Sequence, residues 1–585
     1  MAVTHRFAVC LSGAIALGSY EAGVAAQLYE DLQAVTTTTH GAVRLVIDVV
    51  AGSSAGAVTG LFLAQALATN LDAVAFRDSI WNLWVRDLDI LTLLSPAWDP
   101  AQALFTNSSL TKAEAAAPPM PTASEPYDPK QVLALWITMT TLDGLPSELT
   151  FPRPGPSSTP VAFYPMSYQD YSPFFICGST IKYVDVPIEE LAELEKRGHP
   201  LRWQLLRDAT WELARECARA SGSFPVAFRT RAIERDLRLY PETWGVLAGS
   251  RGRPSPIVPV GKSAPSEACL HFVDGGIFNN EPLGRAIDAV AYLNCLDDSR
   301  KRDARTYVVI EPEPAHRPAL QELLDMRARP ADDAGWPPAA VLAKLLSAYF
   351  SDTVYRDFIA ASKVNGHLKA LEAAAAAAGM TQAQVDAVSA AVGLAHKEYI
   401  TLERIPWDVP PTDQPRLKGA FAGHFGGFLQ QDFRAYDFDV GRREARQWLL
   451  KWLSLHSAAL GLTGAPETLL SAQAPQPAAL QTEPQWGSVA FWRRIQIGTS
   501  GPARVLVLLE RWFGSFASWA SLVGGILLFV VVSALAALGQ SRGWHPLTLG
   551  AAAGAVVVVA RGVVIAARAA ARWWLGRISG QHGPA

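Results

Sequence analysis

The sequence predicts an α/β fold: a parallel sheet with helices on both faces, then a helical extension and a C-terminal transmembrane helical hairpin. Two short apolar runs rich in β-branched residues, 7–11 and 43–50, are each followed by a glycine- and serine-rich turn and a helical pattern. From about Pro338 the pattern becomes helical, and beyond Arg511 two long stretches are almost without charge.

The length and composition of the chain exclude several classes of protein. The chain has 585 residues, of which 50% are hydrophobic and 18% charged, with a net charge of −3. This length predicts two or three folded units. The absence of a long single-sign charge run argues against nucleic-acid binding. Five cysteines without a CxxC pair predict free thiols in a reducing compartment, with neither a disulfide framework nor a structural zinc site.

The elements follow from periodicity and from turn residues. The two apolar runs predict strands, with helices beginning near Tyr20 and Ala57. Further strands are expected at 133–141, 174–177, 270–273 and 307–310, and helices at 205–220, 282–294, 339–361, 368–396 and 442–457. The proline- and glycine-rich loops 113–130 and 243–267 are either flaps over a site or insertions.

These elements predict four segments. They are an α/β domain over 1–320, a helical extension over 321–463, a linker over 464–505 and a membrane hairpin over 506–580.

The hairpin is expected from the charge distribution. No charged residue lies between Arg511 and Arg542, and 515–538 is long enough to span a bilayer. A second span, 546–567, contains Arg561, which must reach the membrane surface or face the first helix. Arginines flank the pair, so the positive-inside rule predicts cytoplasmic ends and a cytoplasmic catalytic region. A buried helical pair in a soluble domain is the alternative.

A candidate nucleophile follows the second predicted strand. Gly52-Ser53-Ser54-Ala55-Gly56 is a G-x-S-x-G sequence between a strand and a helix, where this motif exposes its serine on a sharp turn. The helix N-terminus adds a field that favours developing negative charge. In α/β-hydrolases the motif follows several strands and a later histidine completes a triad. His316 is the candidate for that role, but a lone histidine in a proline-rich loop is more typical of a surface.

Three further motifs give a more specific resemblance. They are Asp274-Gly275-Gly276 with the continuation Ile-Phe-Asn-Asn-Glu-Pro, Ala220-Ser221-Gly222-Ser223-Phe224-Pro225, and a small-residue loop from Leu11 to Gly18. In order and spacing, roughly over 6–314, they resemble the patatin-like phospholipases. The segment Phe425-Gly426-Gly427-Phe428, with Arg434, Asp437-Phe438 and Gly441-Arg442, resembles a helical extension of some bacterial patatin-related proteins.

The resemblance implies a catalytic dyad without a histidine. Ser54 would be the nucleophile and Asp274 the general base, and backbone N–H groups of Gly13, Ala14 and Ile15 would form the oxyanion hole. The motif glycines Gly52, Gly56, Gly275 and Gly276 would permit close backbone approach.

The oxyanion loop departs from the family pattern of Gly-Gly-Gly-x-Arg/Lys-Gly. Two of its glycines are replaced by Ala14 and Ile15, and its basic position is Leu17. A β-branched residue such as Ile15 is expected to resist a positive φ, which would lower activity.

The sequence therefore predicts a serine hydrolase that cleaves ester bonds of membrane (phospho)lipids through an acyl-enzyme. The alternatives are a catalytically weak or silent membrane-tethered scaffold on the same fold, and a lipid acyltransferase. Neither a metal nor another cofactor is expected, and the partners predicted are the lipid substrate and the membrane.

Overall fold

A computed structural model describes most of the first 471 residues. The described residues are 2–93, 105, 127–151, 161–163, 166–184, 201–225, 227–236, 255–256, 267–312, 355–394, 397–407, 417–420, 424–462 and 464–471. All of them lie in one compact unit, formed by 1–98 and 105–481.

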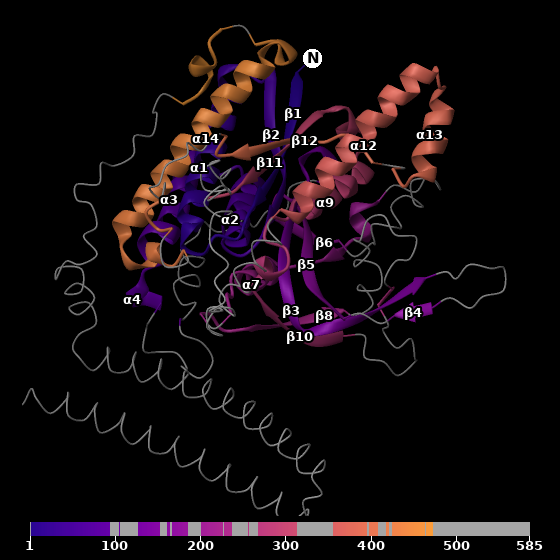
Figure 1. Cartoon of the computed structure of the whole chain (residues 1–585). Helices are drawn as coiled ribbons and strands as arrows, with labels where there is room; N and C mark the ends of the chain where they lie inside the picture. Colours follow the sequence, from indigo (N-terminus) through magenta and orange to yellow (C-terminus); the bar gives the residue numbers. More distant parts are fainter. Residues whose placement is uncertain are drawn as a thin grey trace, which may run out of the picture. The chain divides into compact units, whose positions relative to one another are not determined.

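A large mixed sheet forms the centre of this unit (Figure 1). Its main path runs in the order β12-β11-β1-β2-β3-β5-β6-β7, and β10 pairs with both β3 and β8. The strands are β1 (Val3–Leu11), β2 (Val43–Gly52), β3 (Leu133–Phe151), β4 (Val161–Phe163), β5 (Met166–Cys177), β6 (Thr180–Tyr183), β7 (Arg207–Asp208), β8 (Arg231–Asp236), β9 (Ser255–Pro256), β10 (Glu267–Val273), β11 (Ala304–Ile310) and β12 (Thr401–Ile405).

The expectation of a parallel sheet holds for only part of it. Strands β12, β11, β1, β2 and β3 are parallel, whereas β5 and β10 each run antiparallel to β3. The predicted strands 174–177 and 270–273 are therefore antiparallel members. Among the described residues, only the short strand β4 separates β3 from β5 along the chain, and antiparallel neighbours need no helical crossover.

Helices cover both faces of the sheet. Alternate residues of β1 point to opposite sides, so that Phe7, Val9 and Leu11 enter one hydrophobic cluster while Ala8 and Cys10 enter another. The first face carries α1 (Gly18–Thr38), α2 (Ala55–Thr69), α3 (Ala73–Trp81), the π-helical segment η2 (Asn82–Asp87), α4 (Ile90–Leu93), α7 (Trp211–Ser221) and α14 (Gln431–Leu460). The second carries α9 (Leu283–Leu296) and α12 (Arg356–Ala378), which continues into α13 (Gln382–Ala391).

Helix α14 belongs to the same core as the sheet. Its Trp448 and Trp452 are fully buried and pack edge-on against Phe7 of β1. Glycines on each helix let α14 lie directly on α1: a Cβ at Gly23 would meet the Phe438 carbonyl oxygen at 2.0 Å. Strand β12, which the sequence did not predict, extends the sheet beside β11. The extension thus shares its core with the α/β domain.

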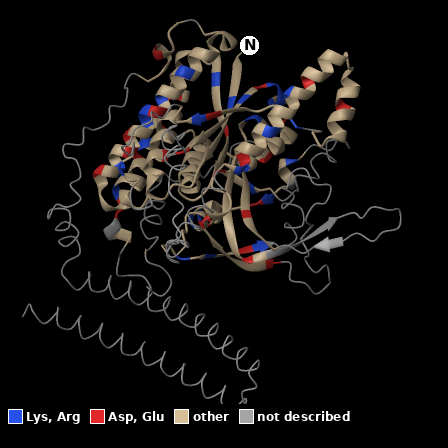
Figure 2. Ribbon diagram, in the orientation of Figure 1, with Lys and Arg blue, Asp and Glu red and all other residues tan. Residues whose placement is uncertain are grey.

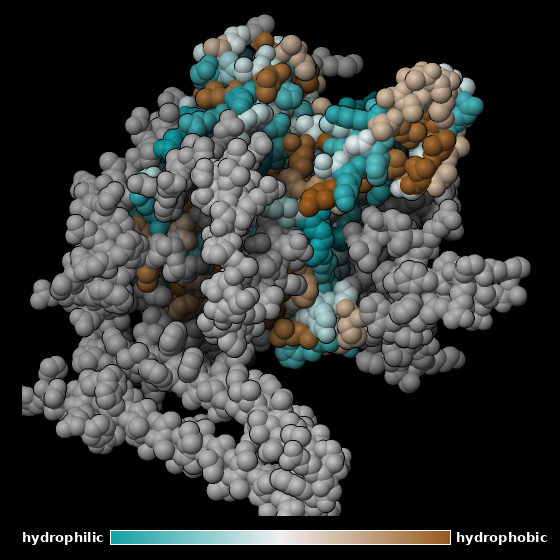
Figure 3. Space-filling view, in the orientation of Figure 1, coloured by the Kyte–Doolittle hydropathy of each residue, from teal (hydrophilic) through white to brown (hydrophobic). Residues whose placement is uncertain are grey.

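The hairpin of α12 and α13 differs from α14. Only two alanines of α12 are buried and no described residue of α13 is. Apolar residues gather on the surface of this hairpin (Figure 3), where Val392 and Ile359 are more than half exposed. Lys and Arg positions alternate with Asp and Glu positions along the helices of this unit (Figure 2).

Several predicted boundaries shift for local reasons. The helix expected over 205–220 begins at Trp211, because the Thr210 side chain accepts the N–H of Leu213 and caps it. The helix expected over 368–396 is interrupted at Gly379, which has a φ of +60° and ends α12. Pro282 lies at the N-cap of α9, one position before its predicted place.

Other expectations fall outside the described residues. These are both membrane spans (515–538 and 546–567), His316, and most of the loops 113–130 and 243–267, the linker 464–505 and the helix 339–361. In the part of the chain that the structure describes, no helix combines the length and apolarity that a membrane span requires.

Candidate active site

Ser54 lies on a sharp turn between β2 and α2. Its φ of 52° and ψ of −122° are unfavourable for a residue with a side chain, and such backbone strain is concentrated at functional sites. The Ser54 N–H donates to Ser221 Oγ at 2.8 Å, which anchors the turn. The side chain is nearly buried, and the N-terminus of α2 begins directly after it.

Asp274 lies within hydrogen-bond distance of Ser54, as the sequence predicted. It follows β10, and Ser54 Oγ donates to Asp274 Oδ2 at 2.5 Å. The Gly276 N–H donates to the other carboxylate oxygen at 2.7 Å, which fixes the plane of the carboxyl group. Burial raises the pKa of Asp274 to about 7, against the opposing effect of these two hydrogen bonds. The carboxyl group is therefore a much stronger base than a solvated aspartate.

Three of the motif glycines meet backbone directly. An added Cβ would lie 2.3 Å from the Thr138 carbonyl oxygen at Gly275, 2.4 Å from that of Leu11 at Gly56, and 2.5 Å from that of Gly56 at Gly52. A Cβ at Gly276 would instead lie 2.6 Å from the Asn280 side chain. The turns that carry Ser54 and Asp274 approach neighbouring strands more closely than any side chain permits.

The Ala-Ser-x-x-Phe-Pro segment supplies groups whose role the sequence did not reveal. Ser221 Oγ accepts the N–H of Ser54, and the carbonyl of Ser223 accepts the N–H of Asp274 at 3.0 Å. Both members of the pair are thus held by one short segment at the end of α7. In the sequence, the only indication that this segment holds the pair is that it lies between the Ser54 motif and the Asp274 motif.

The predicted oxyanion loop has the backbone conformation that Ile15 was expected to resist. Ile15 has a φ of +51°, so its β-branched side chain does not prevent the left-handed conformation. The Gly13 N–H donates to the Asn280 carbonyl at 3.1 Å, and so Gly13 does not offer the free donor expected of it. Within the described chain, the N–H groups of Ala14 and Ile15 have no acceptor.

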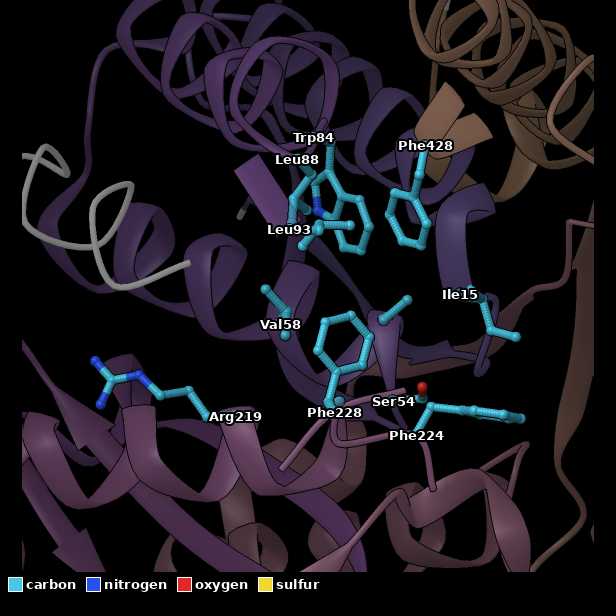
Figure 4. Close-up of a pocket in the computed structure, with 12 residues that line it drawn as sticks. Ile15, Ser54, Val58, Trp84, Leu88, Leu93, Arg219, Phe224, Phe228 and Phe428 are labelled. Carbon is cyan, nitrogen blue, oxygen red and sulfur yellow. The ribbon is translucent and has the colours of Figure 1, made fainter. Parts of the chain in front are cut away.

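An apolar pocket opens beside the Ser54 hydroxyl (Figure 4). The lining of this pocket is predominantly apolar, as is usual for sites that bind small molecules. Its wall is formed by Ile15, Ser54, Ala55, Val58, Trp84, Leu88, Leu93, Arg219, Gly222, Phe224, Phe228 and Phe428. Figure 4 shows Phe224 and Phe228 on the side of Ser54, with Trp84 and Phe428 opposite them.

Neither a histidine nor a metal cluster accompanies the pair in the described residues. No described histidine hydrogen-bonds to Ser54 or Asp274. No group of three or more His, Cys, Asp or Glu among the described residues is placed to hold a metal ion.

Comparison with known proteins agrees with this geometry. The model of the patatin-like phospholipase family matches residues 9–287, which contain Ser54, Asp274 and the oxyanion loop. An uncharacterized protein, y4iI, of Sinorhizobium fredii (strain NBRC 101917 / NGR234) is 24% identical over 265 residues. That match covers 43% of this chain and 32% of y4iI, so the chain spans about a third of this relative's length. Residues 9–287 are therefore a patatin-like phospholipase domain.

Proposed function

We propose that this protein is an enzyme that cleaves ester bonds of membrane (phospho)lipids, with Ser54 as nucleophile and Asp274 as general base. The observation that carries the proposal is the 2.5 Å hydrogen bond from Ser54 Oγ to a buried carboxylate, at the side of an apolar pocket. A hydroxyl becomes an effective nucleophile when a base of matched pKa accepts its proton as it attacks.

In the first half-reaction Asp274 Oδ2 takes the Ser54 proton while Oγ bonds to the ester carbonyl carbon. The carbonyl oxygen becomes an oxyanion, for which the N–H groups of Ala14 and Ile15 are the available donors. The alcohol then leaves with the proton from Asp274, and the acyl group remains bound to Ser54.

In the second half-reaction water attacks the acyl-enzyme. Asp274 accepts a proton from this water and returns it to Ser54 Oγ as the acid departs. The carboxyl group thus alternates between its two protonation states, which a pKa of about 7 makes accessible near neutral pH.

The lining of the pocket favours an acyl chain over a polar group. Apart from Ser54 and Arg219, the pocket is lined by apolar side chains and Gly222. Burial of each additional methylene stabilises binding by about 0.8 kcal/mol. The acyl part of a lipid ester suits this lining.

We further propose that 515–538 and 546–567 anchor the enzyme in a membrane with the catalytic unit on the cytoplasmic side. The support is the uncharged sequence between Arg511 and Arg542 and the flanking arginines. Recovery of the full-length protein in the soluble fraction without detergent would contradict this anchoring.

Product analysis on a mixed phospholipid extract tests the activity. The wild-type enzyme should release fatty acid and lysolipid, and a Ser54→Ala variant should release neither. Labelling of Ser54 by a fluorophosphonate probe provides an independent measure of the nucleophile. Acylation of an added lipid acceptor in place of free acid would identify an acyltransferase, and an absence of both products and labelling would identify a silent scaffold.

A further inference from the structure

The helical extension supplies part of the active site, although it lies outside the residues that match the family. We define the clasp as residues His424–Arg434, which comprise the 3-10 turn η8 (Gly426–Leu429) and the start of α14. We propose that the clasp sets the acyl-chain selectivity of the enzyme: Phe428 and Trp84 limit the pocket, and Arg434 holds the two walls that carry them. This inference rests on the proposed ester hydrolysis.

The clasp first contacts the oxyanion loop. The carbonyl of His424 accepts the N–H of Ala16 at 3.1 Å, next to Ile15 with its left-handed backbone. A Cβ at Gly427 would lie 3.0 Å from the Cβ of Ala16, so the two segments touch. The backbone of this loop is thus held from the side of the extension.

The clasp also forms one wall of the pocket. Phe428 is 3% exposed and lines the pocket opposite Phe224 and Phe228 (Figure 4). Phe425 packs edge-on against both Phe224 and Phe428, with ring centroids 5.7 and 6.0 Å apart. Three aromatic rings therefore join the clasp to the opposite wall, and removal of one would enlarge the space beside the acyl chain.

Arg434 connects this wall to the one that carries Trp84. Its guanidinium is fully buried; Nη1 donates to the Gly427 carbonyl at 2.8 Å, and Nε donates to the Val85 carbonyl at 2.9 Å. Gly427 precedes Phe428, and Val85 follows Trp84. A single planar group thus fixes the separation of the two side chains opposite Phe224 and Phe228. Because it acts through other residues, Arg434 is a positioning residue.

The first test compares chain-length profiles. We would measure kcat/KM on p-nitrophenyl esters from acetate to palmitate for the wild type, Phe428→Ala and Leu455→Ala. Leu455 is 64% exposed on α14, the helix that follows η8, and serves as the control. The ratio of long-chain to short-chain kcat/KM should rise at least about tenfold in Phe428→Ala, because each accommodated methylene contributes to binding. The control should keep the wild-type ratio.

The second test concerns Arg434. Arg434→Ala should broaden the chain-length profile and lower kcat more than it raises the KM for short esters, because the oxyanion loop loses its support. Arg434→Lys should recover only part of both effects, since an ammonium lacks the forked geometry. A loss of stability alone would leave the profile of the folded fraction unchanged.

Binding measurements separate this inference from the proposed function. Dissociation constants of fatty acids of increasing length would be measured with Ser54→Ala and with the Ser54→Ala/Phe428→Ala double variant. A shift of the optimum toward longer chains in the double variant supports the clasp even if no ester is hydrolysed. The inference would be overturned if folded protein with Phe428→Ala had the same chain-length profile as protein that retains Phe428, in both fatty-acid binding and ester hydrolysis.

Discussion

Two buried aspartates, one within a β strand and one directly after another, have opposite electrostatic environments. Asp48 in β2 and Asp274 after β10 are each 3% exposed. Asp48 accepts hydrogen bonds from Arg6, Arg300 and Arg305 at 2.5–3.0 Å, whereas Asp274 accepts them from a hydroxyl and from backbone N–H.

The same burial therefore has different consequences. Burial acts to raise the pKa of Asp48, but the arginines outweigh it and hold that pKa below its usual value. Without a cationic partner, burial dominates at Asp274 and raises its pKa to about 7. Burial alone does not make a carboxylate a strong base; burial without a compensating cation does. Asp48 is a structural ion, and Asp274 is suited to proton transfer.

The largest difference should appear in activity. Asp274→Asn and Ser54→Ala should each lower kcat/KM by at least about 10³-fold, because an amide accepts no proton and alanine has no nucleophile. Ester hydrolysis by purified variants, with circular dichroism as the folding control, measures the effect. Retained hydrolysis in Asp274→Asn would point to a different base, for which His316 is the first candidate.

The second difference should appear in stability. Asp48→Asn leaves three arginines close together without their shared carboxylate and should lower the free energy of unfolding by about 3–5 kcal/mol. Asp303→Asn is the matched control, since Asp303 contacts Arg6 but is 25% exposed, and it should cost less than about 1 kcal/mol. Urea denaturation measures the free energy of unfolding of both variants. Equal losses would show that the buried Asp48 contributes no more to stability than the partly exposed Asp303.

Asp274→Asn should stabilise the folded protein, whereas Asp48→Asn should destabilise it. A carboxyl group whose pKa is higher in the folded than in the unfolded protein destabilises the folded state at every pH at which the unfolded group is ionised. The wild type therefore loses stability as pH rises from about 4 to 7, and the loss levels off above pH 7. At pH 8 the variant should be more stable than the wild type by roughly 2–4 kcal/mol. Thermal unfolding of both proteins at several pH values measures this difference in stability. A difference that does not change with pH would argue against a raised pKa of Asp274.

The smallest effect is the pH dependence of the wild-type rate. Protonated Asp274 accepts no proton, so kcat/KM should fall about tenfold for each pH unit below approximately pH 7 and reach a plateau above it. A neutral water-soluble ester avoids titration of the substrate. An acidic limb centred near 4 would show that Asp274 behaves as a solvated carboxylate.

Helix α14 and the hairpin of α12 and α13 differ in how much of their surface is buried. Both follow the α/β domain in the chain, and both were predicted as one helical extension. Alanine-rich α12 and α13 leave most residues exposed, whereas α14 buries Trp448 and Trp452 against the sheet. Bulky aromatic residues at helical spacing mark the core helix, and a run of alanines does not.

The sequence by itself determined the central strands β1 and β2 and the turn that carries Ser54. These follow from local patterns, because a strand–turn–helix with glycines at fixed positions needs no distant partner to be recognised. Asp274 was indicated only by the resemblance to the patatin-like phospholipases. The tertiary structure decided that the sheet becomes antiparallel beyond β3, that Ile15 adopts a positive φ, and that Gly13 bonds to Asn280. It also decided that Phe428 lines the pocket and that Arg434 joins Gly427 to Val85, although Phe428 and Arg434 lie more than 370 residues beyond Ser54. Such contacts depend on three-dimensional packing between segments far apart in the chain, and no periodicity within either segment encodes them.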